Sequence, residues 1–202
     1  MKKTIWRPLV LGLALGLLDF VSLAVHFVLP TLEETFVGPQ EIFVTISAAL
    51  GGPLGFVPSI FFQELGVHFF LLKGQLPPEQ VQLEIFVSFA DFTAHILAAL
   101  AVVYCYRILY QKAKKTITFF AGWILIVIIY YALLLPLQSF LYNLVIPDML
   151  PLLVWIQSSI LEVLTVAIIS PLIWFALPVR YRRPLWIDVQ PVYPTSVDKP
   201  GS

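Results

Sequence analysis

The stretch ALGGPLGFVPSIFFQELGVHFF, residues 49–70, decides how this chain is organised. It is almost wholly apolar, yet it carries Glu64 and His68 four positions apart, in a run that otherwise suits the interior of a bilayer. A Gly-Gly-Pro break at 51–53 interrupts the run, because glycine is a poor helix former and proline cannot continue the helical hydrogen bonds. We therefore predict a tight helical hairpin over 41–72, with one short helix and one longer helix.

The composition of the whole chain is that of a membrane protein. Of its 202 residues, 59% are hydrophobic and 12% are charged, against roughly 25% charged residues in ordinary soluble domains. A membrane helix needs about 20 apolar residues, or fewer where neighbouring helices shield it. The fold class predicted is all-α, a polytopic membrane protein with six transmembrane helices and a short second helix. The six apolar segments are 5–29, 41–52, 54–72, 84–110, 117–144 and 151–177.

Two regions follow from this pattern. Residues 1–183 form a six-helix transmembrane domain, and residues 184–202, which are rich in proline and lack periodicity, form a flexible cytoplasmic tail. A cleavable signal peptide is the alternative interpretation of the first segment, although its apolar run is longer than that of a typical signal.

The distribution of Lys and Arg distinguishes six spans from five. A single kinked helix over 41–72 would give five spans and would place one basic cluster outside, whereas six spans leave only Lys73 outside. Positive residues favour the cytoplasmic side, so we predict six spans with both termini in the cytoplasm. The cytoplasmic set is Lys2, Lys3, Arg7, Arg107, Lys112, Lys114, Lys115, Arg180, Arg182, Arg183 and Lys199. The opposite loops carry Glu33, Glu34, Glu41, Glu79, Glu84 and Asp148.

Tryptophans fall near the predicted ends of the helices. Trp6, Trp123 and Trp174 lie near cytoplasmic ends and Trp155 near an outer end. Indole rings are apolar with one polar group, so we expect these residues to be interface anchors.

Ionisable side chains occur within four of the predicted spans. Such groups cost a few kcal/mol in the hydrocarbon region, so they normally turn inward and pair. All lie in the outer half or near the midplane, which predicts one polar pocket open to the outer face; polar contacts that only join helices are the alternative. The predicted binding residues are Asp19, Glu64, His68, Asp91, His95 and Glu162. His26 lies on the first span with Asp19 but nearer the outer surface.

A negative pocket with aromatic neighbours favours a cation or a flat heterocycle with a basic nitrogen. A metal ion such as zinc, nickel or cobalt is the second possibility, with Glu64, His68, Asp91 and His95 as candidate ligands. The lone Cys105 excludes a site built from several cysteines. No HExxH, GxSxG or paired-glutamate motif occurs, so we expect no enzyme, no catalytic residue and no cofactor.

Small residues four apart mark the first span. Gly12 and Gly16 let another helix approach closely. The partner is either a helix of the same bundle or another subunit, and the sequence favours neither.

Six spans in about 200 residues, a short second helix and the turn AALGGPLGF at 48–56 resemble the substrate-binding S components of energy-coupling factor transporters. The same turn, with Gly51, Gly52, Pro53 and Gly55, is similar to that in the membrane sensor domains of LytS-type histidine kinases. The resemblance implies capture of a vitamin-like small molecule, and a partner complex of a transmembrane coupling protein and two ATPases. In S components an Ala-x-x-x-Ala pattern docks the coupling protein, and here only the glycine pair of the first span could replace it.

Two functions from different classes follow. The first is a membrane subunit that binds a small molecule and takes it up. The second is a membrane sensor or assembly subunit without transport, and a metal-dependent membrane enzyme ranks below both. The partners expected are the ligand, the coupling protein, the ATPases and the lipid bilayer, with no nucleic acid.

Overall fold

The computed structural model describes the backbone of residues 2–28, 40–67, 81–113, 116–145, 152–178 and 182–186. Within these ranges the chain forms six helices and no strand, so the all-helical prediction is confirmed. The helices are α1 (Lys2–Val28), α2 (Gln40–Gly51), α3 (Pro53–Gly66), α4 (Val81–Lys112), α5 (Thr116–Val145) and α6 (Leu152–Ala176). Their bounds lie close to the apolar segments predicted from the sequence.

Four of the six helices are long and apolar enough to cross a membrane. The qualifying stretches are Ile5–Leu23, Ile85–Lys112, Thr116–Leu144 and Ser159–Ala176. α2 and α3 have 12 and 14 residues, or about 18 and 21 Å at 1.5 Å per residue, against a hydrocarbon core of about 30 Å. The sequence predicted six spans of which the second is short; among the described residues, four helices are long enough to span and both α2 and α3 are short.

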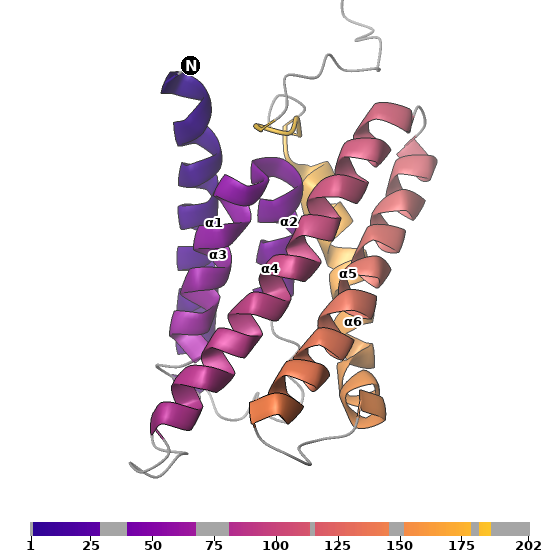
Figure 1. The fold of residues 1–202 in the computed structure, drawn as a ribbon. Coiled ribbons are helices and arrows are strands. Elements are labelled where there is room, and N and C mark those ends of the chain that lie inside the picture. Colours follow the sequence, from indigo (N-terminus) through magenta and orange to yellow (C-terminus); the bar gives the residue numbers. More distant parts are fainter. Residues whose placement is uncertain are drawn as a thin grey trace, which may run out of the picture.

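α2 lies in the middle of the bundle. It packs against α1, α3, α4 and α6, and ten of its twelve residues are buried (Figure 1). α1 and α3 lie side by side, as do α4 and α5. A helix that is buried on every face needs no polar stripe, and the residues after Glu41 in α2 are apolar, small or hydroxylated.

Glycines allow α1, α2 and α3 to approach closely. A Cβ atom at Gly12 would lie 2.0 Å from the carbonyl oxygen of Gly55, and one at Gly16 would lie 3.0 Å from Phe62. A Cβ atom at Gly55 would in turn lie 2.5 Å from the carbonyl oxygen of Ser47, in α2. The glycine pair of α1 is therefore used for packing inside the bundle, and in this structure it offers no free face to another subunit.

An aromatic cluster joins α4, α5 and α6 at the end of the bundle where α1 begins. The rings of Phe119 and Trp174 stack with centroids 4.2 Å apart, and the indole of Trp174 donates to the hydroxyl of Tyr106 at 2.8 Å. Trp123 is also buried in this cluster, 5.2 Å from the ring of Tyr106. The prediction of interface anchors is wrong for Trp123 and Trp174, because their rings meet other rings between the helices.

Trp6 is 64% exposed, as an anchor requires, and nothing is described of the Trp155 side chain.

The predicted tail begins at residue 184, and its first residues, 184–186, lie against the α2–α3 turn. Residues 187–202 lie outside the described part of the chain.

Candidate functional site

Glu41 is the centre of a buried polar cluster. The sequence assigned it to an outer loop, but it lies in the first turn of α2 and is only 5% exposed. Its Oε1 atom accepts a hydrogen bond from Gln63 Nε2 at 2.9 Å and lies 2.9 Å from His95 Nε2. The Tyr130 hydroxyl donates to the second oxygen, Oε2. One carboxyl group therefore connects α2 with α3, α4 and α5.

His95 lies between Glu41 and the backbone of its own helix. Its Nδ1 atom is 2.9 Å from the carbonyl oxygen of Asp91, which can only accept, so Nδ1 carries a hydrogen. Nε2 and Glu41 Oε1 then share a single proton. Wherever that proton resides, the Glu41–His95 pair has no net charge, and such pairing is what burial of two ionisable groups requires.

Two more carboxyl groups approach the same imidazole. Glu64 Oε1 and Asp91 Oδ1 each lie 3.6 Å from His95 Nδ1. Asp91 Oδ1 accepts a hydrogen bond from Gln138 Nε2 at 2.6 Å, whereas Glu64 Oε1 is buried and has no donor. Glu64 therefore presents an unused acceptor beside the neutral Glu41–His95 pair.

Asp19 and Glu162 complete the cluster from opposite sides of the bundle. Asp19 is fully buried, neither of its carboxyl oxygens has a hydrogen-bond donor, and it lies within electrostatic range of Glu41 and His95. Glu162 is partly buried and interacts with Tyr131 and Glu41. With these two residues, all six helices contribute to the cluster.

The cluster has more acceptors than donors. The buried oxygens without a donor are Asp19 Oδ1, Asp19 Oδ2, Gln63 Oε1 and Glu64 Oε1. Carboxylate and amide oxygens accept hydrogen bonds, and leaving one buried and unbonded costs about 1–3 kcal/mol. A ligand that brings N–H groups or a positive charge would satisfy these atoms. An anion would be repelled wherever these carboxyl groups are ionised.

The geometry also comes close to a metal site. One ligand atom each from Glu64, Asp91 and His95 lies within 4.8 Å of the others. Ligands about 2.0–2.2 Å from one ion can be no more than about 4.4 Å apart, so an ion would draw the three groups slightly inward. It would also replace the hydrogen on His95 Nδ1 and so break the bond to the Asp91 carbonyl.

The structure brings together five of the six residues predicted to bind a ligand. These are Asp19, Glu64, Asp91, His95 and Glu162. His68 lies outside the described residues, and nothing is described of the His26 side chain. Asp91 and His95, four residues apart on α4, make a side-chain contact of 3.6 Å, and the shorter bond of His95, at 2.9 Å, goes to the Asp91 backbone.

Sequence reasoning missed all the residues bonded at the centre of the cluster except His95. Glu41 stands at the first turn of a short helix, where an acid is easily assigned to the loop, and Gln63 and Tyr130 carry no charge that draws attention in an apolar segment. One signal was available. The helix that follows Glu41 has no polar face, so a charge in its first turn is likewise enclosed.

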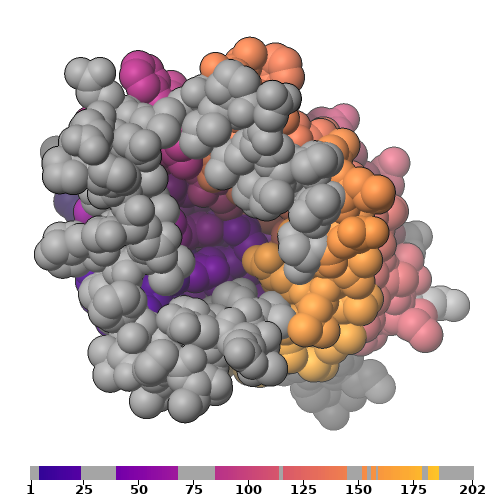
Figure 2. Space-filling view, turned by 90° about the horizontal axis from the view of Figure 1, so that it is seen from below, coloured from indigo at the N-terminus to yellow at the C-terminus, as the bar shows by residue number. Residues whose placement is uncertain are grey.

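The cluster lies towards the end of the bundle opposite the start of α1. Figure 2 looks at this end, where atoms in the purple of α2 and α3 are visible beside the orange of α6. α2 begins and α3 ends towards this end (Figure 1). Glu41, in the first turn of α2, is therefore on the side of the bundle away from the α2–α3 turn.

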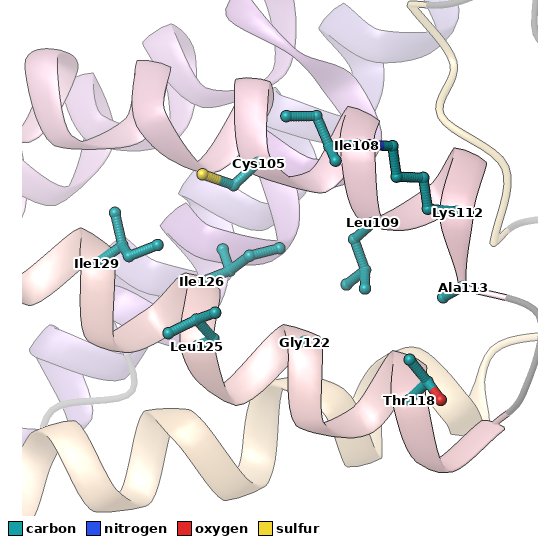
Figure 3. A pocket seen from close by; sticks show the side chains of 10 residues that line it. All are labelled: Cys105, Ile108, Leu109, Lys112, Ala113, Thr118, Gly122, Leu125, Ile126 and Ile129. Atoms are coloured by element: carbon teal, nitrogen blue, oxygen red, sulfur yellow. The ribbon is translucent and has the colours of Figure 1, made fainter.

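A separate groove lies on the side of the bundle between α4 and α5. It has a volume of about 300 Å³ and is lined almost entirely by apolar groups (Figure 3). It shares no residue with the polar cluster, and its lining suits hydrocarbon better than a polar ligand. The lining residues are Cys105, Ile108, Leu109, Lys112, Ala113, Thr118, Gly122, Leu125, Ile126 and Ile129.

No family model matches the chain, and comparisons with curated proteins and with solved structures found no match.

Proposed function

We propose that this chain is an integral membrane subunit that captures a small cationic or N–H-rich molecule, in the manner of an S component, from a pocket on the outer face. The observation that carries the proposal is the set of buried acceptor oxygens on Asp19, Gln63 and Glu64 that have no donor among the residues that the structure describes. A vitamin-like heterocycle with a basic nitrogen has the chemistry that this set lacks.

Charge supports the same ligand class. The Glu41–His95 pair is neutral, so the remaining carboxyl groups of the cluster leave the site neutral or negative, according to their protonation. Coulomb attraction grows as the surroundings become less polar, so a cation that enters a buried site gains more than it would at the surface. The ligand loses its hydration on entry, and this cost opposes the gain. A flat molecule that also contacts apolar groups offsets part of the cost and is therefore favoured.

The membrane topology is part of the proposal. α2 and α3 form a shielded hairpin between the four long helices, both termini lie in the cytoplasm, and the cluster faces the outer half of the bilayer. Support comes from the Lys and Arg residues, which all fall on one side except Lys73. Residues 1–183 then form the membrane domain and residues 184–202 the cytoplasmic tail.

Uptake would need a coupling protein and ATPases as partners. Because Gly12 and Gly16 face α3, such a partner would have to dock on another surface of the bundle. A sensor or assembly subunit could use the same pocket without transport. Recovery of a coupling protein and an ATPase with the chain on gentle purification separates the two functions.

The test of ligand capture is mass spectrometry of small molecules released from the purified protein. We expect a nitrogen-containing cation or heterocycle with the wild-type chain. Glu64→Gln should weaken its binding by about tenfold or more, the cost of one hydrogen bond to a charged group. Cys105→Ser, on the far groove, is the matched control. Absence of any retained molecule, or retention that Glu64→Gln leaves unchanged, would contradict the proposal.

A divalent metal ion is the second candidate ligand, favoured by the closeness of Glu64, Asp91 and His95. Metal analysis of the purified protein tests it. One equivalent of zinc, nickel or cobalt in the wild type, lost in Asp91→Asn, would support the ion. A metal-free protein that retains an organic molecule would exclude it.

A further inference from the structure

Residues 182–186 lie across the turn between α2 and α3, at the end of the bundle where α1 begins (Figure 1). The backbone N–H of Leu185 donates to the carbonyl oxygen of Leu50 at 2.7 Å, and the indole of Trp186 donates to that of Ala49 at 3.0 Å. The carbonyl of Ala49 would normally accept from residue 53, which is Pro53 and has no N–H. The segment therefore supplies donors that the end of α2 lacks.

The Trp186 ring also fits directly onto Gly52. A Cβ atom at Gly52 would lie 2.6 Å from Trp186 Cγ, so only glycine leaves room for the ring. Gly52 has φ +59°, a left-handed conformation that glycine adopts most readily. The turn is thus shaped both for its own geometry and for the indole above it.

The other end of the segment is held by α6 and α4. The Arg182 side chain donates to the carbonyl oxygens of Leu177 at 2.7 Å and Phe175 at 2.6 Å, and its guanidinium lies 5.1 Å from the centre of the Trp174 ring. The Tyr106 hydroxyl donates to the carbonyl oxygen of Arg182 at 3.2 Å. Arg182 is therefore an anchor, whereas Leu185 and Trp186 are held at the turn by two hydrogen bonds and one ring contact.

The turn between α2 and α3 lies short of the ends of the long helices, and residues 182–186 cover it (Figure 1). Glu41 precedes Gly52 by eleven positions, or about 16 Å along the helix. The latch, defined as residues 182–186, lies over the turn at this end, and Pro184 within it is buried. The polar cluster lies towards the opposite end of the bundle, where α2 begins (Figure 1).

We propose that residues 182–186 act as a latch that closes the cytoplasmic end of the α2–α3 pair and must detach at Trp186 before the pair can move. This inference rests on the proposed uptake function and its topology. With the latch in place, the site communicates with the outer face alone. With the latch released at Trp186 and still anchored at Arg182, the pair is free to shift and to open a route to the cytoplasm.

Labelling of a buried cysteine tests the latch without any ligand. Ala48 is fully buried in α2, one turn before Gly52, and Ala48→Cys in a Cys105→Ser background provides a single thiol there. A membrane-impermeant maleimide is added to vesicles on the side where a C-terminal tag is accessible. Labelling should be slow with the latch intact and about tenfold faster with Trp186→Ala, because it follows the population of the opened state.

Two further variants make the result specific. Trp186→Phe keeps a ring on Gly52 but loses the indole N–H, so its labelling should be intermediate. Trp6→Ala removes an exposed tryptophan elsewhere and should change nothing. Equal labelling of Trp186→Ala and its parent, or fast labelling of the parent itself, would overturn the latch.

A cross-link keeps the proposal testable if Trp186→Ala fails to fold. Leu50→Cys with Leu185→Cys, again without Cys105, places thiols on residues whose backbones are hydrogen-bonded. Rapid linkage by oxidation or a short bis-maleimide is expected, and failure to link would contradict the contact. A protein that labels as expected but retains no ligand would sink the proposed function and leave the latch standing.

Discussion

Glu41 and Glu64 are both buried carboxyl residues, but their oxygens are bonded very differently. Glu41 is bonded by Gln63 and Tyr130 and paired with His95, whereas Glu64 Oε1 has no donor in the described part of the chain. A residue whose bonds are complete within the protein holds helices together. A residue with an unused bond is the one available to a ligand.

This difference predicts opposite effects of two substitutions on stability. Glu41→Ala removes one partner of a buried pair and should lower the free energy of unfolding by about 3–5 kcal/mol. Glu64→Gln removes no bond from Oε1 and should change it by less than about 1 kcal/mol. Unfolding in a denaturing detergent, followed by circular dichroism, measures both. Similar losses of unfolding free energy in the two variants would show that the carboxyl group of Glu64 is needed for stability and is not free for a ligand.

Sequence reasoning found the charged members of the cluster other than Glu41, because ionisable residues within apolar segments are conspicuous. Asp19, Asp91 and Glu162 were identified in this way, and the structure brings them together. Sequence reasoning could not find Gln63 or Tyr130, whose importance depends on which residues lie opposite them across helix interfaces. The ligand-binding role of Asp19, Asp91 and Glu162 stays a prediction.

At the scale of the elements, the turn between α2 and α3 restricts which residues can stand in it, through both φ and the space for a Cβ atom. Gly52 has a positive φ and lies under the Trp186 ring, whereas a Cβ atom at Gly51 would make only an ordinary contact, 3.4 Å from the carbonyl oxygen of Pro8. Two adjacent glycines therefore have different roles. The structure has α2 ending at Gly51 and α3 beginning at Pro53, and the sequence alone could not distinguish the role of one glycine from that of the other.

The turn gives a matched pair of substitutions. Gly52→Ala should lower the free energy of unfolding by about 1–2 kcal/mol from backbone strain alone, and by more once the indole is displaced. Gly51→Ala should be neutral or slightly stabilising, because alanine is the better helix former. Thermal unfolding in detergent compares them. A Gly51→Ala protein as unstable as Gly52→Ala would mean that close packing and not φ governs the turn.

The partners of each helix were beyond sequence reasoning for a related reason. Hydropathy found six segments because each is apolar along its length, but it contains no information on which segment becomes central. That α2 is enclosed follows from close approaches such as Gly12 to Gly55, which depend on three-dimensional fit.

At the scale of the whole molecule, the proposed topology depends on the distribution of positive charge. Lys112 ends α4 and Thr116 begins α5, so the connection between them should lie in the cytoplasm with both termini, and the connection between α5 and α6 outside. Asp148→Cys in a Cys105→Ser background should react with an impermeant maleimide added to intact cells. Lys114→Cys should react only after the membrane is opened. The reverse pattern would invert the molecule and place the polar cluster on the inner side.

The enclosure of α2 has a consequence for how the protein is made. A helix of twelve residues is too short to cross the hydrocarbon core on its own, so α2 is not expected to be released into lipid as an independent span. We therefore expect α2 and α3 to enter together, after α1 is in place to receive Gly55 and Pro58 against its glycines. In the proposed topology, assembly of the bundle is then ordered, with the short pair packing onto the first long helix.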